Sequence, residues 1–207
     1  LERAMAGFPA PGGVAATMAE AIQPLAVTLY ARRGMYPRLP VLTLSGRVSR
    51  RPPALPAAVE ARPLTAADAD LLQGIDAEVL GVDRSVDHRW YLSEGRPGWL
   101  LERRGRPSAY VYVRLGPTTP ASPGAAASAT VGPAAALRPA DLGLAVRAAL
   151  TALGDAVVVV AVPAPAIPAQ RVLWEAGLVA GPSPGLLLAS REFGRFDRYL
   201  LGAYGLL

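Results

Sequence analysis

The sequence predicts an α/β fold in which helices flank a mixed β-sheet. Its 207 residues are 52% hydrophobic and 18% charged, a composition that favours a packed core over disorder. Apolar runs of strand length alternate with helix-forming segments, several of which end at Gly. The run at 157–162 is continuously apolar, as is typical of a strand buried on both faces.

Composition also excludes several classes of protein and site. The chain has no Cys, so disulfides, thiolate metal sites and Cys nucleophiles are ruled out. Pro, Gly and Arg interrupt every apolar stretch before the roughly 20 residues that span a bilayer, so we expect no membrane partner. The net charge of +5 comes from scattered Arg residues without Lys, which argues against nucleic-acid binding and is compatible with a small anionic partner.

The first 46 residues are predicted to form a strand–helix–strand unit. Residues 1–7 have the character of a helix end, and 14–18 that of a short buried strand. Pro24 suits the first turn of a helix that ends at Gly34, and 41–44 is predicted to be the next strand. This unit is too small to bury its own sheet. Because the chain begins at Leu without a signal peptide, we expect it to be a fragment.

A linker rich in Arg and Pro is predicted at 47–57 and separates the first unit from a domain at 58–207. The tail from Phe193 onward has no predicted element. The elements predicted within the domain are strands at 59–62, 99–103, 109–115, 126–136, 157–162 and 186–189, and helices from Thr65 to Leu80 and at 86–93, 139–153 and 167–176.

One pattern occurs twice in the chain. Both copies follow a predicted strand, form a helix and end at Gly, which suggests duplication of an αβ module. Any αβ unit with a Gly cap gives a similar match, so chance remains the alternative. The matching residues are Gln23, Ala26, Leu29, Tyr30, Gly34 and Met35 in the first copy, and Ala166, Ala169, Val172, Leu173, Gly177 and Leu178 in the second.

The segment from Gln23 to Met35 resembles the N-x-x-A-x-x-L-Y-x-x-x-G-F signature of the GNAT superfamily of N-acetyltransferases. Residues 59–191 are similar to a complete GNAT domain of the kind found as the second half of tandem acetyltransferases. The resemblance implies a GNAT-like mixed sheet flanked by helices, preceded by a partial β-α-β module at 1–46.

The resemblance also implies a site for acetyl-CoA between two splayed central strands. The family holds the pyrophosphate on a [QR]-x-x-G-x-[GA] loop at a helix start, where free N–H groups attract anions. Here Asp141 adds a negative charge that Arg138 must offset, and an ordinary helix start remains the alternative. The residues assigned to acetyl-CoA are Ala136, Arg138, Ala140, Leu142, Gly143, Leu144 and Ala145.

For catalysis, the resemblance places Tyr30 as the acid that protonates the departing thiolate, with core packing as the alternative. The second copy has Leu173 at that position, which cannot transfer a proton, so Tyr110, Tyr112 or water would have to replace it as the donor. For the base that deprotonates the amine, the predicted strand offers Ser128 but no carboxylate. Asp83 and Arg84 are assigned with Tyr110 to the acceptor, although a local surface ion pair is the commoner explanation for the first two.

The implied function is transfer of an acetyl group from acetyl-CoA to a primary amine of a small molecule or peptide, in the cytoplasm, with a homodimer among the expected assemblies. The alternative is a non-catalytic GNAT-like domain with a structural or ligand-binding role. His88 is expected at a solvated helix position, because a single His without carboxylate neighbours at suitable spacing predicts no metal site. Trp90, Trp99 and Trp174 are expected to anchor the core.

Overall fold

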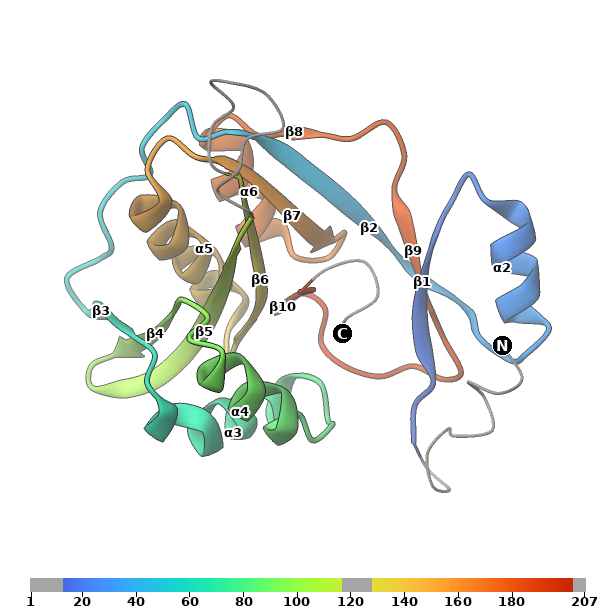
Figure 1. The fold of residues 1–207 in the computed structure, drawn as a ribbon, viewed down its shortest axis with the longest axis horizontal. Coiled ribbons are helices and arrows are strands. Elements are labelled where there is room, and N and C mark those ends of the chain that lie inside the picture. The colour runs from blue at the N-terminus through green and yellow to red at the C-terminus, as the bar shows by residue number, and fades with distance from the viewer. Residues whose placement is uncertain (1–12, 117–127, 203–207) are drawn as a thin grey trace.

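The computed structural model describes residues 13–116 and 128–202, so the expected helix end at 1–7 lies outside the described residues (Figure 1). The strands are β1 (Ala16–Glu20), β2 (Tyr36–Arg47), β3 (Val59–Pro63), β4 (Gly98–Arg103), β5 (Arg106–Leu115), β6 (Ser128–Ala136), β7 (Val157–Pro163), β8 (Val179–Ala180), β9 (Gly185–Ala189) and β10 (Tyr199–Leu200). The helices are α2 (Pro24–Ala31), the short 3-10 helix η1 (Ala66–Asp68), α3 (Ala69–Val79), α4 (Ser85–Ser93), α5 (Pro139–Leu153) and α6 (Ile167–Glu175).

All strands belong to one mixed sheet, in the order β1-β9-β2-β7-β6-β5-β4-β3. The β6–β7 pair is parallel and the other neighbours are antiparallel. β10 pairs with β6, and β8 pairs with β2, outside this path. The fold class predicted from the sequence is therefore confirmed as a mixed α/β sheet flanked by helices.

Alternating side chains of the central strands divide the core into two layers. On β5, Val111 and Val113 face the layer under α5 and α6, whereas Tyr110 and Tyr112 face the layer under α3 and α4. This alternation follows from the period of two in a strand. β7 departs from the prediction of burial on both faces at Val159, whose side chain is 37% exposed.

The two copies of the repeated pattern have the same backbone geometry at both ends of their helices. Gly34 and Gly177 end the helices with φ of 80° and 98°, a region that glycine adopts without steric cost. Equivalent hydrogen bonds run from the Gln23 N–H to the Glu20 carbonyl (2.9 Å) and from Met35 to Tyr30 (3.1 Å) in the first copy, and from Ala166 to Pro163 (2.9 Å) and from Leu178 to Leu173 (3.1 Å) in the second.

The two copies also exchange strands. Each contributes two strands to one half of the sheet, but the strands of one copy do not pair with each other. β1 of the first copy pairs with β9 of the second, and β7 of the second pairs with β2 of the first. β2 and β9 pair side by side between them, which makes the order β1-β9-β2-β7 alternate between the copies.

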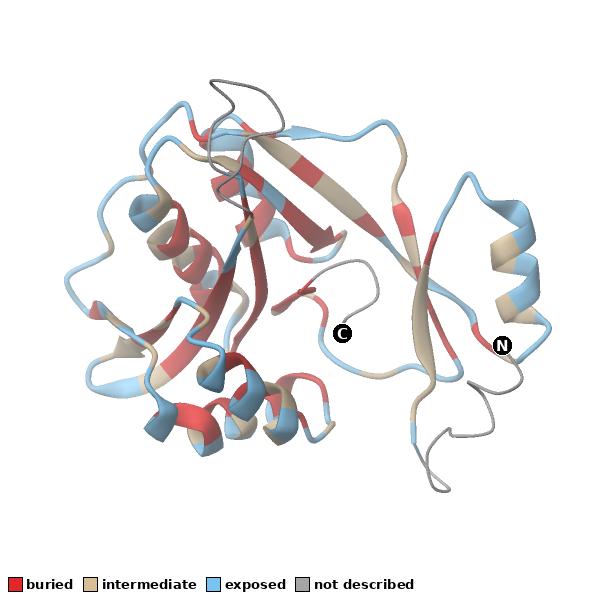
Figure 2. Ribbon diagram, in the orientation of Figure 1, coloured by how far each residue is buried: buried red, intermediate tan, exposed pale blue. Residues whose placement is uncertain are grey.

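The surroundings of the two helices differ. α6 packs against α5, and its residues Ala169, Val172 and Leu173 are buried. α2 lies beside β1 at the far end of the sheet and has no buried residue, although it is largely apolar (Figure 2). Leu25 is 84% exposed, and β1 forms one edge of the sheet among the described residues.

Candidate functional site

The central strands β6 and β7 diverge, as the resemblance to the GNAT superfamily implies, and we call the space between them the splay. They pair over three positions, from Ser128 with Val157 to Thr130 with Val159. Beyond this point the chain's own C-terminal segment lies between them. β10 pairs with β6 at Ala134 and Ala135, and Leu201 bridges to β7. The gap between the splayed strands is therefore filled by protein.

Close contacts fit the C-terminal segment to β6. The N–H of Ala136 donates to the carbonyl of Arg198 (3.0 Å), and the Arg198 guanidinium donates back to the Leu137 carbonyl (2.6 Å). A side chain at Gly132 would collide with the Leu201 carbonyl, so the absence of a Cβ there allows the segment to approach. β10 is thus an integral strand of the splay.

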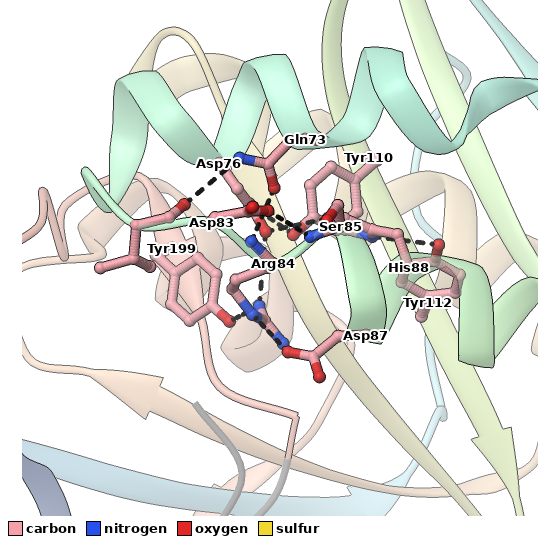
Figure 3. Close-up of polar contacts among 11 residues, drawn as sticks. Gln73, Asp76, Asp83, Arg84, Ser85, Asp87, His88, Tyr110, Tyr112 and Tyr199 are labelled. Carbon is pink, nitrogen blue, oxygen red and sulfur yellow. Dashed lines mark hydrogen bonds and ion pairs between the residues drawn. The ribbon is translucent and has the colours of Figure 1, made fainter. Parts of the chain in front are cut away.

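A buried polar network fastens β10 from the side of α3 and α4 (Figure 3). Its centre is Asp76 on α3, whose side chain is fully buried. Asp76 accepts a hydrogen bond from the Tyr110 hydroxyl (2.6 Å), contacts His88 Nε2 (3.0 Å) and forms an ion pair with Arg84 (3.5 Å). Arg84 also donates to the hydroxyl of Tyr199 on β10. The network therefore connects β10 to α3, α4 and β5.

Burial sets the protonation of the phenols in this network. Removal from water raises the pKa of Tyr110, Tyr112 and Tyr199 above the usual value of a phenol, because it disfavours the charged phenolate. These hydroxyls are therefore neutral hydrogen-bonding groups at physiological pH. Since Asp76, His88 and Tyr110 are completely buried, their arrangement can stabilise the fold but offers no open face to a substrate.

Several sequence expectations about this region were wrong. His88 is fully buried between Asp76 and Tyr112, not solvated. Arg84 is buried and pairs with Asp76 and Asp87, while Asp83 accepts a hydrogen bond from the Ser85 N–H, so the two do not form a local ion pair. The structure brings Arg84 and Tyr110 together on Asp76 and leaves Asp83 outside. Their assignment to an acceptor amine stays a prediction.

The residues assigned to acetyl-CoA lie at the junction of β6 and α5. Two residues separate the strand from the helix, which begins at Pro139, so Gly143 and Ala145 lie inside the helix. Gly143 is buried, and a Cβ there would come within 2.9 Å of the Pro168 carbonyl of α6, so it permits close helix packing. Ala136, Leu142 and Ala145 are also buried, Leu144 is half-buried, and Arg138 and Ala140 are exposed.

Asp141, which the sequence placed beside the expected phosphates, is neutralised by two arginines. Arg138 Nε lies 3.0 Å from one carboxylate oxygen and Arg103 lies 2.5 Å from the other. The predicted compensation by Arg138 is confirmed, and Arg103 is a second partner from β4 that local sequence did not reveal. Because Asp141 is itself 1% exposed, a carboxylate already holds the anion position at the start of α5.

The junction and the splay do not fit acetyl-CoA as the resemblance implies. β10 uses the backbone of β6 inside the splay, where the resemblance places the cofactor. The expected phosphate loop is replaced by a helix that starts two residues after the end of β6, with Asp141 in its first turn. The obstacle is steric, because the chain's own strand occupies the place of the cofactor.

The two predicted catalytic residues lie on different parts of the sheet. Tyr30 is half-buried on α2 and packs near β1 and β9. Ser128 is exposed at the start of β6, opposite Val157. The sheet order places β9, β2 and β7 between β1 and β6, so the structure does not bring the two side chains together. Their catalytic roles stay predictions.

A cavity of about 680 Å³ lies where β2, the turn before α6 and the segment before β10 meet. Arg38, Pro165 and residues 192–197 line it. No local sequence pattern predicts this cavity, because its walls come from three distant segments. Among the described ranges 13–116 and 128–202, no helix is long and apolar enough to cross a membrane.

Comparison with known proteins defines the fold. No protein-family model and no curated protein sequence matches the chain. Among solved structures, it is similar to a putative acetyltransferase from Pyrococcus horikoshii, with a TM-score of 0.62 and 15% identity over 94% of this chain and 58% of that one. A GCN5-related N-acetyltransferase from Sphaerobacter thermophilus gives a TM-score of 0.57 and 15% identity over 95% of this chain and 66% of that one.

A GCN5-related N-acetyltransferase from Kribbella flavida gives a TM-score of 0.54, with 14% identity over 84% of this chain and 67% of that one. The chain therefore has the fold of GNAT acetyltransferases, and at this level of identity the likeness concerns the fold alone. The chain spans less than two thirds of the length of the first two of these structures.

Proposed function

We propose that this chain is part of a GNAT-type N-acetyltransferase that moves an acetyl group from acetyl-CoA to a primary amine of a small molecule or peptide. Within it, residues 58–207 form a GNAT-like unit that does not bind acetyl-CoA in its own splay. The absence of an acetyl-CoA site in this unit is inferred from the position of β10, which pairs with β6 and is followed by Leu201, which bridges to β7.

The proposal assigns acetyl transfer to a first module, of which residues 1–46 are the C-terminal part. Tyr30 belongs to this unit, whereas the second copy has Leu173 at the equivalent position. The repeated geometry supports the assignment, because α6 is covered by α5 and β7 pairs with β6, while α2 and the outer edge of β1 have no such neighbours among the described residues. A further strand and helix would complete the first unit.

The second unit has a structural role in this proposal. Its strand β9 lies between β1 and β2 and pairs with both, from Ala16–Ala189 on one side to Val41–Gly185 on the other. The first unit cannot form a continuous sheet without β9. A domain that has lost its cofactor site would therefore be retained because it holds the strands of the other domain together.

The test uses S-acetylpantetheine, which carries the thioester arm of acetyl-CoA without its phosphates. We expect no change in the melting temperature of the 207-residue chain and no added hydrogen-exchange protection at residues 132–136. A unit with an open splay would be stabilised by about 2.7 kcal/mol at a hundredfold excess over the dissociation constant. Stabilisation of that size, with protection at 132–136, would overturn the proposal.

A second measurement follows the reaction itself. The 207-residue chain is incubated with acetyl-CoA and a panel of primary amines, and free thiol is measured. We expect no release above the uncatalysed rate, because the described residues lack an open cleft between β6 and β7. Acetylated amine formed by this chain alone would show that 58–207 is catalytic.

A further inference from the structure

A second cavity, of about 580 Å³, is lined almost entirely by arginine. We call it the arginine pocket and define it by Ala58, Arg103, Arg104, Arg106 and Arg138. Its walls are the residue before β3, the β4–β5 turn and the residue before α5. β5 borders β6 on the side opposite β7, so the arginine pocket and the splay lie on different sides of β6.

Two of the four arginines are held in place. Arg103 and Arg138 bind the two oxygens of Asp141 at 2.5 and 3.0 Å, and the Asp141 side chain is 1% exposed. This carboxylate fixes both guanidinium groups without cancelling their combined charge. Arg103 Nε is buried without a hydrogen-bond partner among the described residues, so a donor remains unsatisfied beside the pocket.

The other two arginines are exposed, and their side chains make no hydrogen bond or ion pair with the described residues. The backbone positions Arg104, whose N–H donates to the Ala58 carbonyl (3.1 Å) and whose φ is 51°. Four guanidinium groups and one carboxylate leave a net charge of +3 on the pocket and its bound Asp141. A concave surface of one sign concentrates its field and attracts counter-ions.

We propose that the arginine pocket binds a small ligand that carries two or more linked phosphate groups. The planar guanidinium fork matches phosphate oxygens and forms charge-assisted hydrogen bonds with them. A net charge of +3 calls for more than one anionic group, and the cavity volume accommodates a diphosphate or triphosphate. No aromatic residue lines the pocket, which disfavours stacking of nucleic-acid bases.

The proposal is tested by calorimetry on the full chain with inorganic triphosphate, pyrophosphate and phosphate in low salt. We expect affinity to rise with the number of phosphates and to fall steeply with added salt. The same titration with ADP distinguishes the source of the phosphates. Equal affinity for ADP and pyrophosphate assigns recognition to the phosphates alone, and tighter binding of ADP assigns it to a nucleotide. Both results support a polyphosphate site.

The decisive variant is Arg104→Ser with Arg106→Ser, because neither side chain has a structural partner. We expect it to weaken triphosphate binding about a hundredfold or more, since it removes two charge-assisted contacts of roughly 1.5 kcal/mol or more each and about 1.4 kcal/mol is a factor of ten. The matched control is Arg89→Ser with Arg171→Ser, which removes the same charge from α4 and α6. Equal weakening by the control, no binding of triphosphate, or tighter binding of single-stranded RNA would each overturn the proposal.

This experiment is independent of the proposed function. S-acetylpantetheine has no phosphate and probes the splay, whereas triphosphate has no thioester and probes the arginine pocket. A failure of one proposal therefore leaves the other measurable in the same protein.

Discussion

Helices α2 and α6 follow equivalent strands and end at equivalent glycines, yet α6 is packed against α5 while α2 has no buried residue. The local sequence that shapes the backbone is shared, and the surroundings that stabilise it are not. A helix of eight or nine residues is marginal on its own in water, so tertiary contacts must provide most of its stability. The repeated pattern therefore determines the backbone geometry of each helix, whereas the neighbouring elements determine how far the helix is buried.

The largest expected difference concerns apolar side chains of the two helices. Leu173→Ala removes a fully buried side chain from the layer between α5 and α6 and should lower the free energy of unfolding by about 3 kcal/mol. Leu25→Ala on α2 is 84% exposed and should change it by less than about 0.5 kcal/mol. Urea unfolding of both variants measures the contrast, and equal losses would show that α2 is as well packed as α6.

The next prediction concerns the strand that fills the splay in the second unit. Tyr199→Phe removes the hydroxyl that accepts from Arg84, whose Nη2 is already buried without a partner among the described residues. The variant would leave a second N–H group of the buried Arg84 guanidinium without this partner, which should lower the free energy of unfolding by about 2 kcal/mol. Tyr36→Phe, at an exposed position of the first unit, is the control and should be neutral. Thermal unfolding compares the two, and an unaffected Tyr199→Phe protein would mean that the network does not anchor β10.

The starts of the helices differ as well. α2 begins without a side-chain cap, whereas the 3-10 helix η1, which leads into α3, begins with a capping box in which Asp68 accepts a hydrogen bond from the Thr65 N–H. Asp68 also accepts from Arg62. The hydrogen bond from Arg62 lowers the pKa of Asp68 to about 2. The stabilisation from this carboxylate is therefore complete above about pH 4, which is the pKa of Asp in the unfolded chain, and is lost as the pH falls through about 2.

Asp68→Asn should reduce stability at pH 7 by about 1 kcal/mol, since Arg62 is partly exposed and solvent screens the pair. It should also flatten the pH dependence of unfolding between about pH 4 and 2. Asp70→Asn, at the exposed neighbouring position, is the matched control. A pH profile that is the same in Asp68→Asn and the unmodified chain would refute the assignment.

The smallest effect on stability is expected from charging the exposed face of α2. Leu25→Asp with Leu29→Asp should leave unfolding within about 0.5 kcal/mol, because both side chains are exposed. The apolar face should instead drive self-association at high concentration, and the double variant should reduce it. Sedimentation measures this, with Val86→Asp on α4 as the control. If both proteins associate like the unmodified chain, the α2 face is not a contact surface.

Local signals predicted much of the fold. α5 was predicted with its observed bounds, because Pro139 opens the helix and Gly154 follows it. Gly34 and Gly177 ended their helices as expected, since the positive φ required there favours glycine strongly. Each of these signals lies within one or two turns of the element that it determines.

Features that depend on distant partners were missed. β10 is a two-residue strand that exists because β6 and β7 diverge, and no local pattern sets it apart from the apolar tail. The burial of His88 was missed because its carboxylate partner, Asp76, lies on another helix. Trp90 and Trp174, expected in the core, are 49% and 47% exposed, since apolar type alone does not determine which face of a helix is covered.

Because the two copies exchange strands, the Pro-rich connection after β2 does not separate two independent sheets. That connection reads as the border between two domains, yet β2 lies between β9 and β7, both of which come from the far side of it. Proteolytic cleavage between β2 and β3 would thus yield two fragments that stay associated through backbone pairing. Either fragment, produced separately, would lack the neighbours with which its central strands pair in the whole chain.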